Sequence, residues 1–288
     1  MQTTQRARYA ERIERAIALL ERRARAGEPP ALADLAAAAA LSDYHFHRIF
    51  RVMTGETVGA AVTRVRLGGS LPVLDKGVTA AAGHSGYATA QAYARALKAA
   101  AGTTATNLRD DRNRRDEVAA AFAQPAISTS EPAPPLTITI TSFAPLRLAA
   151  LRNVGDYTEL NGAYTRLYEL LMEQIAPEEI TGIYGIPHDD PREVAGKDCR
   201  YDCAFATASP LAPISGITTI DLPGGLALFM SHAGDYDLIE ASADALYAEA
   251  VAADIPVSAA PLLIHALDDP DEVAAADLRA TVYLPLQA

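Results

Sequence analysis

The second half of the chain repeats itself with a constant offset of 79 residues. A Gly-Asp-Tyr tripeptide ends at Tyr157 and again at Tyr236, and an Asp-Asp-Pro tripeptide begins at Asp189 and again at Asp268. Three further pairs keep this offset: Leu167-Tyr168 with Leu246-Tyr247, Glu193-Val194 with Glu272-Val273, and Arg200 with Arg279. The shared offset predicts two copies of one supersecondary unit, which bury their apolar faces against each other.

Each copy is predicted to run strand, Gly-Asp-Tyr turn, amphipathic helix, strand, Asp-Asp-Pro turn, strand, which is a β-α-β-β repeat. The alternating segment Leu136–Thr141 is typical of a strand with one buried face. The two copies predict an α+β domain packed as a pseudo-two-fold pair, with an antiparallel sheet on one side and two helices on the other. A cleft between the copies is the predicted ligand site, because pockets favour the interfaces of packed units.

Residues 116–135 are the clearest boundary in the chain. They begin like a helix and end in Ser, Thr and four prolines, a composition that buries no core and is typical of a semi-rigid linker. The pattern before them is helical and rich in alanine, and 288 residues suffice for about two domains. We therefore expect a multi-domain chain, with an all-α domain at residues 1–115, a linker at 116–135 and the α+β domain at 136–288.

Charge divides the chain in the same place. Residues 1–115 hold 18 Lys and Arg against 10 Asp and Glu, a net charge of +8, whereas residues 116–288 hold 7 against 26, a net charge of −19. A basic half joined to an acidic half indicates that only the first half binds a polyanion such as double-stranded DNA. Chance variation of solvated surface charge is the alternative, and charge alone does not decide between them.

Several classes of protein are disfavoured by composition. No apolar run approaches the roughly 18 residues that a membrane span requires, and Met1–Tyr9 lacks the apolar stretch of a signal peptide. The two cysteines, Cys199 and Cys203, do not provide a disulfide framework or a four-ligand zinc site. We expect a cytoplasmic protein without metal, cofactor or membrane partner.

The first half contains a weaker duplication, in which a short helix, a tight turn and a second helix occur twice. Ser42 and Thr89 are suitable N-caps of the two second helices, because their hydroxyls accept hydrogen bonds from the first helical turn. Gly55 and Gly102 follow these helices where a left-handed C-cap favours glycine. The pattern therefore predicts two helix-turn-helix motifs.

The second helix of each motif carries candidate DNA-reading residues. In the first, the spacing of Phe46, Ile49 and Phe50 predicts a core-facing side, which leaves polar side chains on the exposed side. Arginine pairs with guanine, and glutamine with adenine, through two hydrogen bonds in the major groove. The alternative is that these are ordinary solvated faces. The candidates are Tyr44, His47, Arg48 and Arg51 on the first helix, and Gln91 and Arg95 on the second.

Residues 6–109 resemble the DNA-binding domain of the AraC/XylS family of transcription regulators, chiefly through segments 32–58 and 78–102. The resemblance implies that both second helices enter successive major-groove segments on one face of DNA. It places Tyr44, His47 and Arg48 on the first recognition helix, and Gln91 and Arg95 on the second. The chain departs from the family at Gly68-Gly-Ser-Leu-Pro72, which is predicted to weaken or break the helix that joins the motifs.

Residues 136–288 resemble the GyrI-like effector-binding domain, which is often joined to AraC-type domains in multidrug-sensing regulators. The repeated Gly-Asp-Tyr and Asp-Asp-Pro tripeptides and the closing segment 281–286 carry the resemblance. It implies a bulky, often cationic aromatic ligand between the two halves, held by aromatic side chains. The alternative for each tyrosine is a core residue whose hydroxyl is hydrogen-bonded. The candidate tyrosines are Tyr157, Tyr164, Tyr184 and Tyr236.

One departure bears on the ligand. The family commonly has a buried glutamate on a late strand, in a P-x-x-E-x-Y pattern, whereas Pro261-Leu-Leu-Ile-His-Ala266 has Ile264 at that position. The acid would pair with a cation or act as a general base in related hydrolytic domains. Ile264 therefore predicts an apolar pocket floor that favours neutral aromatic ligands, and no catalytic residue. The paired aspartates of the Asp-Asp-Pro tripeptides are expected to shape turns.

These observations favour a non-enzymatic, ligand-responsive transcription regulator that senses a small apolar or aromatic molecule. Its expected partners are double-stranded DNA and the effector, with RNA polymerase as a further candidate. One alternative is a ligand-sequestering or hydrolytic GyrI-like protein with a degenerate DNA-binding domain. Another is a protein-binding module, because GyrI-like domains are also linked to gyrase inhibition.

Overall fold

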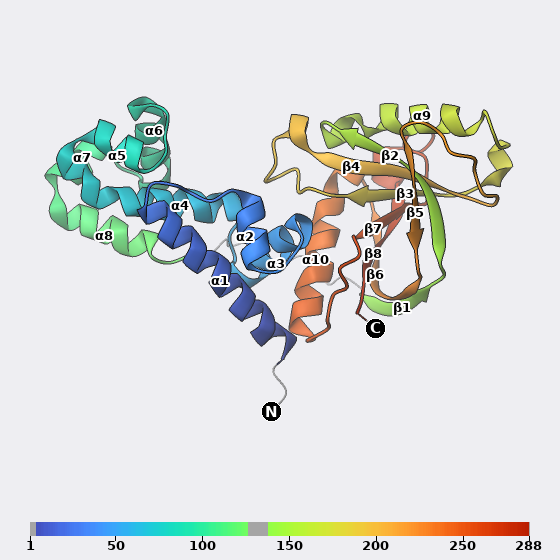
Figure 1. The fold of residues 1–288 in the computed structure, drawn as a ribbon, viewed down its shortest axis with the longest axis horizontal. Coiled ribbons are helices and arrows are strands. Elements are labelled where there is room, and N and C mark those ends of the chain that lie inside the picture. The colour runs from blue at the N-terminus through green and yellow to red at the C-terminus, as the bar shows by residue number, and fades with distance from the viewer. Residues whose placement is uncertain (1–3, 126–137, 288) are drawn as a thin grey trace. The chain divides into compact units, whose positions relative to one another are not determined.

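The computed structural model describes residues 4–125 and 138–287 (Figure 1). They form two compact units, a helical unit (residues 7–125) and a sheet unit (residues 138–287). None of the helices in these ranges combines the length and the apolar character that a bilayer crossing requires.

The helical unit contains two helix-turn-helix motifs, as predicted. The first is α2–α3 and the second is α5–α6. Ser42 accepts a hydrogen bond from the His45 amide at 3.3 Å, and Thr89 accepts one from the Ala92 amide at 3.1 Å. Gly55 and Gly102 end the two second helices with φ of 75° and 66°, so the predicted caps are confirmed. The helices are α1 (Gln5–Arg25), α2 (Leu32–Ala38), α3 (Asp43–Thr54), α4 (Val58–Ser70), the 3-10 helix η1 (Leu71–Lys76), α5 (Val78–His84), α6 (Ala90–Ala101), α7 (Ala105–Asp110) and α8 (Arg112–Phe122).

The helix that joins the motifs runs through Gly68-Gly69, and it ends as an α-helix at Ser70, within the segment that was expected to weaken or break it. Helix α4 runs through both glycines to Ser70 and continues directly into η1. A Cβ atom at Gly68 would lie 3.2 Å from the Cβ of Phe122, so glycine allows α8 to approach closely. The Ser70 hydroxyl is buried and lies 2.9 Å from the Tyr93 hydroxyl. Pro72 stands at the start of η1, where its missing amide hydrogen costs little.

Helix α8 extends the helical unit into the segment assigned to the linker. Val118 is buried in the core of the second motif, and Phe122 packs against that core four residues later. The Arg64 guanidinium donates to the Phe122 carbonyl at 2.7 Å. Residues 116–122 are therefore helical, whereas 126–135 lie outside the described residues.

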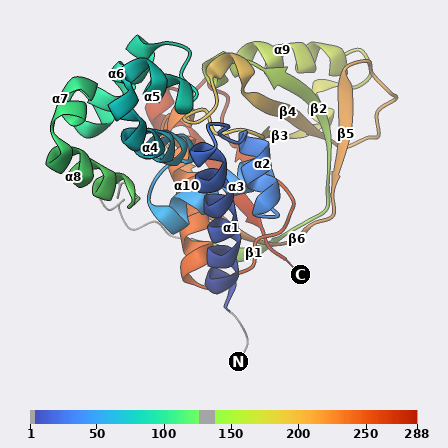
Figure 2. The same cartoon turned by 60° about the vertical axis from the view of Figure 1, so that its left-hand side comes forward.

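The sheet unit is an α+β domain with an antiparallel sheet, as predicted, and the sheet has eight strands. The strand order is β1-β6-β8-β7-β3-β4-β2-β5. Helix α9 packs on β2 and β4 (Figure 2), and α10 packs on β6 and β8. The elements are β1 (Thr139–Phe143), β2 (Leu146–Val154), α9 (Leu160–Leu171), β3 (Ile180–Pro187), β4 (Arg200–Thr207), β5 (Ile217–Leu222), β6 (Gly225–Ala233), α10 (Ile239–Ala252), β7 (Leu263–Ala266) and β8 (Arg279–Pro285).

Each copy has one strand more than the predicted β-α-β-β repeat. The first copy is β1-β2-α9-β3-β4 and the second is β5-β6-α10-β7-β8. The first strand of each copy pairs with the other copy, β1 with β6 and β5 with β2. The start of the segment predicted as this strand, Leu136 and Thr137, lies outside the described residues. Alternation along the sequence indicated the first of these strands, but it does not show that the strand pairs with the other copy.

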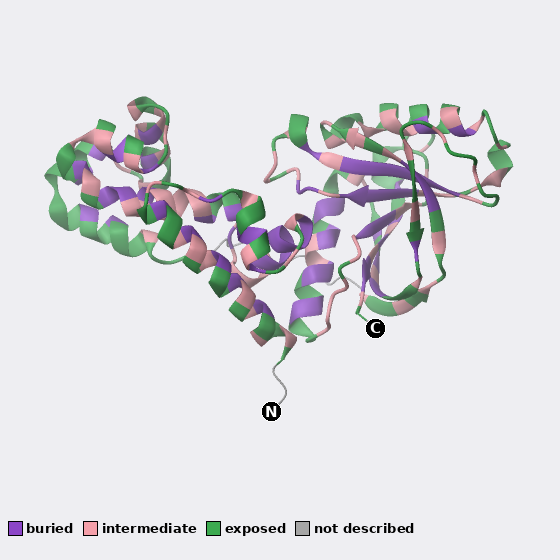
Figure 3. Cartoon of the chain, in the orientation of Figure 1, coloured by how far each residue is buried: buried purple, intermediate pink, exposed green. Residues whose placement is uncertain are grey.

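The pseudo-two-fold relation is visible in the central pair of strands. Strands β3 and β7 are antiparallel neighbours, and Gly185 is the register partner of Ile264. These residues are also related by the offset of 79, so the pseudo-two-fold passes between them. The central strands are largely buried, with β4 buried over 201–206 (Figure 3).

Candidate ligand pocket and DNA-reading helices

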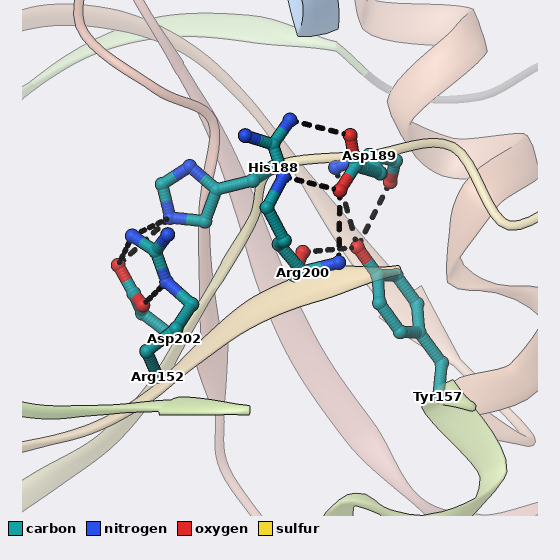
Figure 4. A network of polar contacts seen from close by, with 6 residues as sticks. All are labelled: Arg152, Tyr157, His188, Asp189, Arg200 and Asp202. Atoms are coloured by element: carbon teal, nitrogen blue, oxygen red, sulfur yellow. Dashed lines mark hydrogen bonds and ion pairs between the residues drawn. The ribbon is translucent and has the colours of Figure 1, made fainter. Parts of the chain in front are cut away.

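The repeated tripeptides form a hydrogen-bonded staple in the first copy (Figure 4). The Tyr157 hydroxyl lies 2.7 Å from the Arg200 carbonyl oxygen and 2.9 Å from that of Asp189, and its single proton is shared between them. The Asp189 carboxylate accepts hydrogen bonds of 2.7 and 2.8 Å from the Arg200 guanidinium and one of 2.8 Å from the Arg200 amide. The Gly-Asp-Tyr turn is thereby fixed to the Asp-Asp-Pro turn and to the start of β4.

The second copy repeats the staple. The Tyr236 hydroxyl lies 2.7 Å from the Arg279 carbonyl oxygen and 3.0 Å from that of Asp268. The Asp268 carboxylate accepts two hydrogen bonds from the Arg279 guanidinium, at 2.9 and 2.7 Å. The constant offset of 79 residues therefore reflects one set of hydrogen bonds that occurs in both copies.

Burial and ion pairing set the charge state of the staple. Burial alone would raise the pKa of Asp189, but the hydrogen bonds and positive charge of Arg200 outweigh it and hold that pKa below its ordinary value. Burial raises the pKa of the Tyr157 hydroxyl, so it remains a proton donor. The staple thus joins a carboxylate, a guanidinium and a neutral phenol.

We expect Tyr157→Phe to lower the free energy of unfolding of the sheet unit by about 1–2 kcal/mol, because two buried carbonyls lose a donor. Chemical denaturation of the full chain measures this. The control is Tyr168→Phe, since Tyr168 is exposed and has no hydrogen bond of this kind among the described contacts. Equal effects of both substitutions would show that the staple does not contribute to stability.

The first copy contains a second ionic cluster (Figure 4). The buried Asp202 carboxylate accepts two hydrogen bonds from the Arg152 guanidinium and lies 2.7 Å from the His188 Nε2. Burial would raise the pKa of Asp202, but the hydrogen bonds from His188 and Arg152 lower it to about 2. The equivalent residues of the second copy are Ser231, Leu267 and Thr281, which cannot form this cluster.

The cluster predicts acid sensitivity of the sheet unit. The pKa of Asp202 falls from 3.8 to about 2 on folding, so its stabilisation is complete above about pH 5 and is lost as the pH falls through 2. Linkage then gives a contribution of about 2 kcal/mol at neutral pH. Denaturation of the wild type and of Asp202→Asn at pH 6 and pH 2.5 should show a stability difference that shrinks at the lower pH. A difference that does not change with pH would contradict this.

A cavity of about 1130 Å³ lies between the two copies, where the repeat predicted a ligand site. Its walls come from the Gly-Asp-Tyr turns of both copies, α9, the start of α10, strands β3, β4 and β7, and the second Asp-Asp-Pro turn. Four of the five residues proposed for ligand contact line it: Tyr157, Tyr164, Tyr236 and Ile264.

The fifth candidate, Tyr184, is not among the lining residues, and its placement in the pocket was wrong. Successive residues of a strand point to opposite faces, and Ile183 and Gly185 line the cavity on either side of it. The Tyr184 ring instead belongs to the apolar cluster on the other face and stacks on His265, with ring centroids 4.5 Å apart. His265, the neighbour of Ile264, is also a lining residue, although its ring stacks on Tyr184.

The lining tyrosines serve the fold and the cavity together. The Tyr164 hydroxyl donates to the Tyr184 carbonyl at 2.9 Å, while its ring lies 6.0 Å from that of Phe205. Tyr157 and Tyr236 likewise use their hydroxyls in the staples. The hydroxyls of these tyrosines are hydrogen-bonded within the fold, as the alternative of a core residue predicted. Their rings line the cavity.

Sequence reasoning missed several lining residues. Tyr201 and Phe205 on β4 line the cavity, and no local motif distinguished them. Seven carboxylates also line it and, among its lining residues, there is no Lys or Arg, so the absence of an acid at Ile264 does not leave the cavity free of acids. Two of them, Asp268 and Asp269, belong to the Asp-Asp-Pro tripeptides, which were expected only to shape turns. The carboxylates are those of Asp156, Asp235, Asp237, Glu240, Asp268, Asp269 and Asp271.

Several of these acids are held by neighbours. Asp271 accepts a hydrogen bond from the Asn161 side chain on α9 at 3.2 Å. The buried Glu240 carboxylate on α10 lies 3.7 Å from the Arg192 guanidinium, which also binds Asp190 and Asp244 at 2.8 Å. Within the described ranges, no group of three or more His, Cys, Asp and Glu side chains is arranged to hold a metal ion.

The candidate DNA-reading residues differ in exposure. Gln91 and Arg95 are exposed on α6, opposite the buried Tyr93 and Leu97, as predicted.

On α3 the predicted exposed side is wrong. Tyr44, His47 and Arg48 are buried and Arg51 is half-buried, with Arg48 only 1% exposed. The Arg48 guanidinium lies 5.2 Å from the centroid of the Tyr44 ring, within the range of a cation–π contact. Burial covers 44–50 without a break and is not limited to the side predicted by helical spacing.

Two solved structures are similar to part of this chain. The crystal structure of the EcmrR C-terminal domain is 13% identical, with a TM-score of 0.47, and the likeness covers 53% of this chain and 98% of that one. The crystal structure of a hydrolase encoded by lin2189 from Listeria innocua is 11% identical, with a TM-score of 0.40, covering 54% of this chain and 94% of that one.

Sequence comparison gives the family. The "SPbeta prophage-derived putative transcriptional regulator YosT" of Bacillus subtilis (strain 168) is 30% identical over 96 residues, which are 31% of this chain and 61% of that relative. This chain therefore matches less than two thirds of the relative's length. A helix-turn-helix domain model matches residues 35–111, and the model of the GyrI-like small molecule binding domain matches residues 136–287. The chain belongs to the GyrI-like small molecule binding domain family and carries an AraC-type helix-turn-helix region in its N-terminal half.

Proposed function

We propose that the chain is a ligand-responsive DNA-binding transcription regulator. Its sheet unit binds a small apolar or aromatic molecule, and its helical unit binds double-stranded DNA. The observation that carries the proposal is the cavity of about 1130 Å³ between the copies, in the same chain as two capped helix-turn-helix motifs. A ligand with different affinities for two states of the chain would shift their populations and so change DNA binding.

The cavity supports an aromatic ligand through its rings. Tyr157, Tyr164 and Tyr236 offer ring surfaces whose orientation is fixed by hydrogen bonds to the backbone, so little side-chain entropy is lost on binding. Ile264 adds an apolar surface at the centre of the floor.

A thermal-shift screen of the full chain with neutral aromatic compounds and with lipophilic cations tests ligand binding. A compound that binds the native state at 100 times its Kd stabilises it by about 2.7 kcal/mol, which raises the melting temperature. Because carboxylates line the cavity beside Ile264, the two compound classes are compared directly. The absence of any stabilising compound of either class would contradict the proposal.

The proposed DNA contacts begin with Gln91 and Arg95, whose exposure on α6 suits hydrogen bonds to base edges. Tyr44, His47, Arg48 and Arg51 remain proposed contacts of α3. For the first three, contact with a base requires a DNA-bound state in which they are more exposed than here. Such a regulator acts where the chromosome lies, so we place it in the cytoplasm, with RNA polymerase as a further partner.

We infer that the cavity holds its ligand without chemical conversion. Several of its acids are engaged in structure, as Asp268 is with Arg279 and Asp271 is with Asn161. A general base needs a carboxylate within reach of a substrate proton, and these carboxylates are already hydrogen-bonded. Incubation with aromatic esters should give no hydrolysis above the uncatalysed rate, whereas turnover that depends on Glu240 would favour the hydrolytic alternative.

A further inference from the structure

The two residues at the centre of the cavity floor occupy equivalent positions but differ greatly in size. Gly185 and Ile264 are related by the 79-residue offset, are register partners in β3 and β7, and both line the cavity. If these two residues were alike, the pseudo-two-fold would give the two halves of the floor the same shape. Because they differ in size, other side chains must fill the space over Gly185.

Tyr201 fills that space in the first copy. A Cβ atom at Gly185 would lie 1.8 Å from the Tyr201 hydroxyl oxygen and 2.5 Å from its Cζ, so the phenol end of Tyr201 occupies the space above the glycine. In the second copy the equivalent of Tyr201 is Ala280, and the equivalent of Gly185 is Ile264. Each copy thus combines one large and one small residue, with the order exchanged.

Tyr201 is also held in place from the side. Its ring lies 5.0 Å from the Tyr157 ring in an edge-to-face arrangement, and Tyr157 is fixed by the staple. The side chain is 7% exposed and lines the cavity together with Gly185 and Ile264. Its ring is therefore a rigid part of the floor over the first copy.

We propose that Tyr201 determines how large an aromatic ligand the cavity accepts. The proposal rests on the proposed function, because it concerns the same cavity. The Tyr201 ring limits the depth over the first copy, and Ile264 does so over the second. Removing the ring would extend the cavity across Gly185, whereas a Cβ at Gly185 would push the ring into the cavity and reduce its depth.

The test compares two neutral aromatic alcohols of different size, 1-naphthol and 1-hydroxypyrene, bound to the full chain and followed by their fluorescence. We expect Tyr201→Ala to shift the ratio of the two Kd values about tenfold in favour of the larger probe, as expected for a change in pocket size. Gly185→Ala should shift the ratio in the opposite direction. Tyr201→Leu provides a second enlarging variant if Tyr201→Ala does not fold, which circular dichroism shows.

Tyr184→Ala is the matched control. Tyr184 neighbours Gly185 on the same strand, is 8% exposed and faces the other side of the sheet, so its loss costs similar burial without removing a side chain from the cavity floor. Its probe ratio should equal that of the wild type. A ratio in Tyr201→Ala or Tyr201→Leu equal to that in Tyr184→Ala would overturn the inference. If neither probe bound any form, the proposed function would itself fail and the inference with it.

Discussion

Gly185→Ile should destabilise the sheet unit by about 3 kcal/mol, and adding Tyr201→Ala should recover most of that loss. The isoleucine side chain must occupy space that the Tyr201 hydroxyl now fills, since even a Cβ atom would lie 1.8 Å from that oxygen. Tyr201→Ala removes the obstacle and copies into the first half the combination that Ile264 and Ala280 form in the second. Chemical denaturation of the two single variants and the double variant gives the coupling energy.

The specificity of this rescue is checked with a different double variant. Gly185→Ile combined with Tyr184→Ala removes a tyrosine of similar burial from the opposite face of the sheet, and it should show no recovery. If the Tyr201 double variant were no more stable than Gly185→Ile alone, the two copies would not be interchangeable at this position.

Arg95→Ala should weaken binding to specific DNA by about 10–100-fold, which corresponds to about 1–3 kcal/mol for a lost bidentate base contact. Arg95 is exposed on α6, one helical turn beyond the exposed Gln91. The loss should be largest at a single base position of the site. Fluorescence anisotropy with a set of single-base variants of the site measures both effects.

Arg114→Ala is the control for this prediction. Arg114 is an exposed arginine of α8 that pairs with Glu117 at 2.6 Å, so its removal changes net charge by the same amount without altering α6. Its effect should be small and independent of sequence. Arg48→Ala is measured beside them, with its fold checked by circular dichroism because Arg48 is buried. A loss of binding with folded Arg48→Ala but none with Arg95→Ala would assign DNA reading to the first motif alone.

Features that depend on neighbouring residues could be predicted from the sequence. The caps at Ser42 and Thr89 and the left-handed glycines Gly55 and Gly102 follow from backbone hydrogen bonding within a few residues. The repeat identified the paired turns and the cleft between copies, because the same contacts recur at a fixed offset.

The errors arise where distant residues decide the outcome. Gly68-Gly69 remains helical because Phe122, more than fifty residues away, packs on the glycine surface. Tyr184 was placed in the cavity because composition cannot tell which face of a strand is occupied when both are apolar. Tyr201 was missed since its role depends on the missing side chain of Gly185 on the neighbouring strand.

The salt dependence of DNA binding connects the charge distribution with the proposed function. If about five phosphates are contacted, log K falls with log salt at a slope of about −4 to −5. The net charge of +8 in residues 1–115 favours such contacts, whereas the −19 of residues 116–288 opposes them. The acidic sheet unit alone should not bind DNA.

The central claim is tested most directly by fluorescence anisotropy of the full chain on its own upstream DNA, with and without a saturating compound from the thermal-shift screen. We expect binding at least about 10³-fold tighter than to scrambled DNA of equal length. The compound should change that affinity by about 5–150-fold, the usual range of coupling between two sites. Equal affinity for both DNAs, unchanged by a compound that demonstrably binds the chain, would contradict a ligand-responsive regulator.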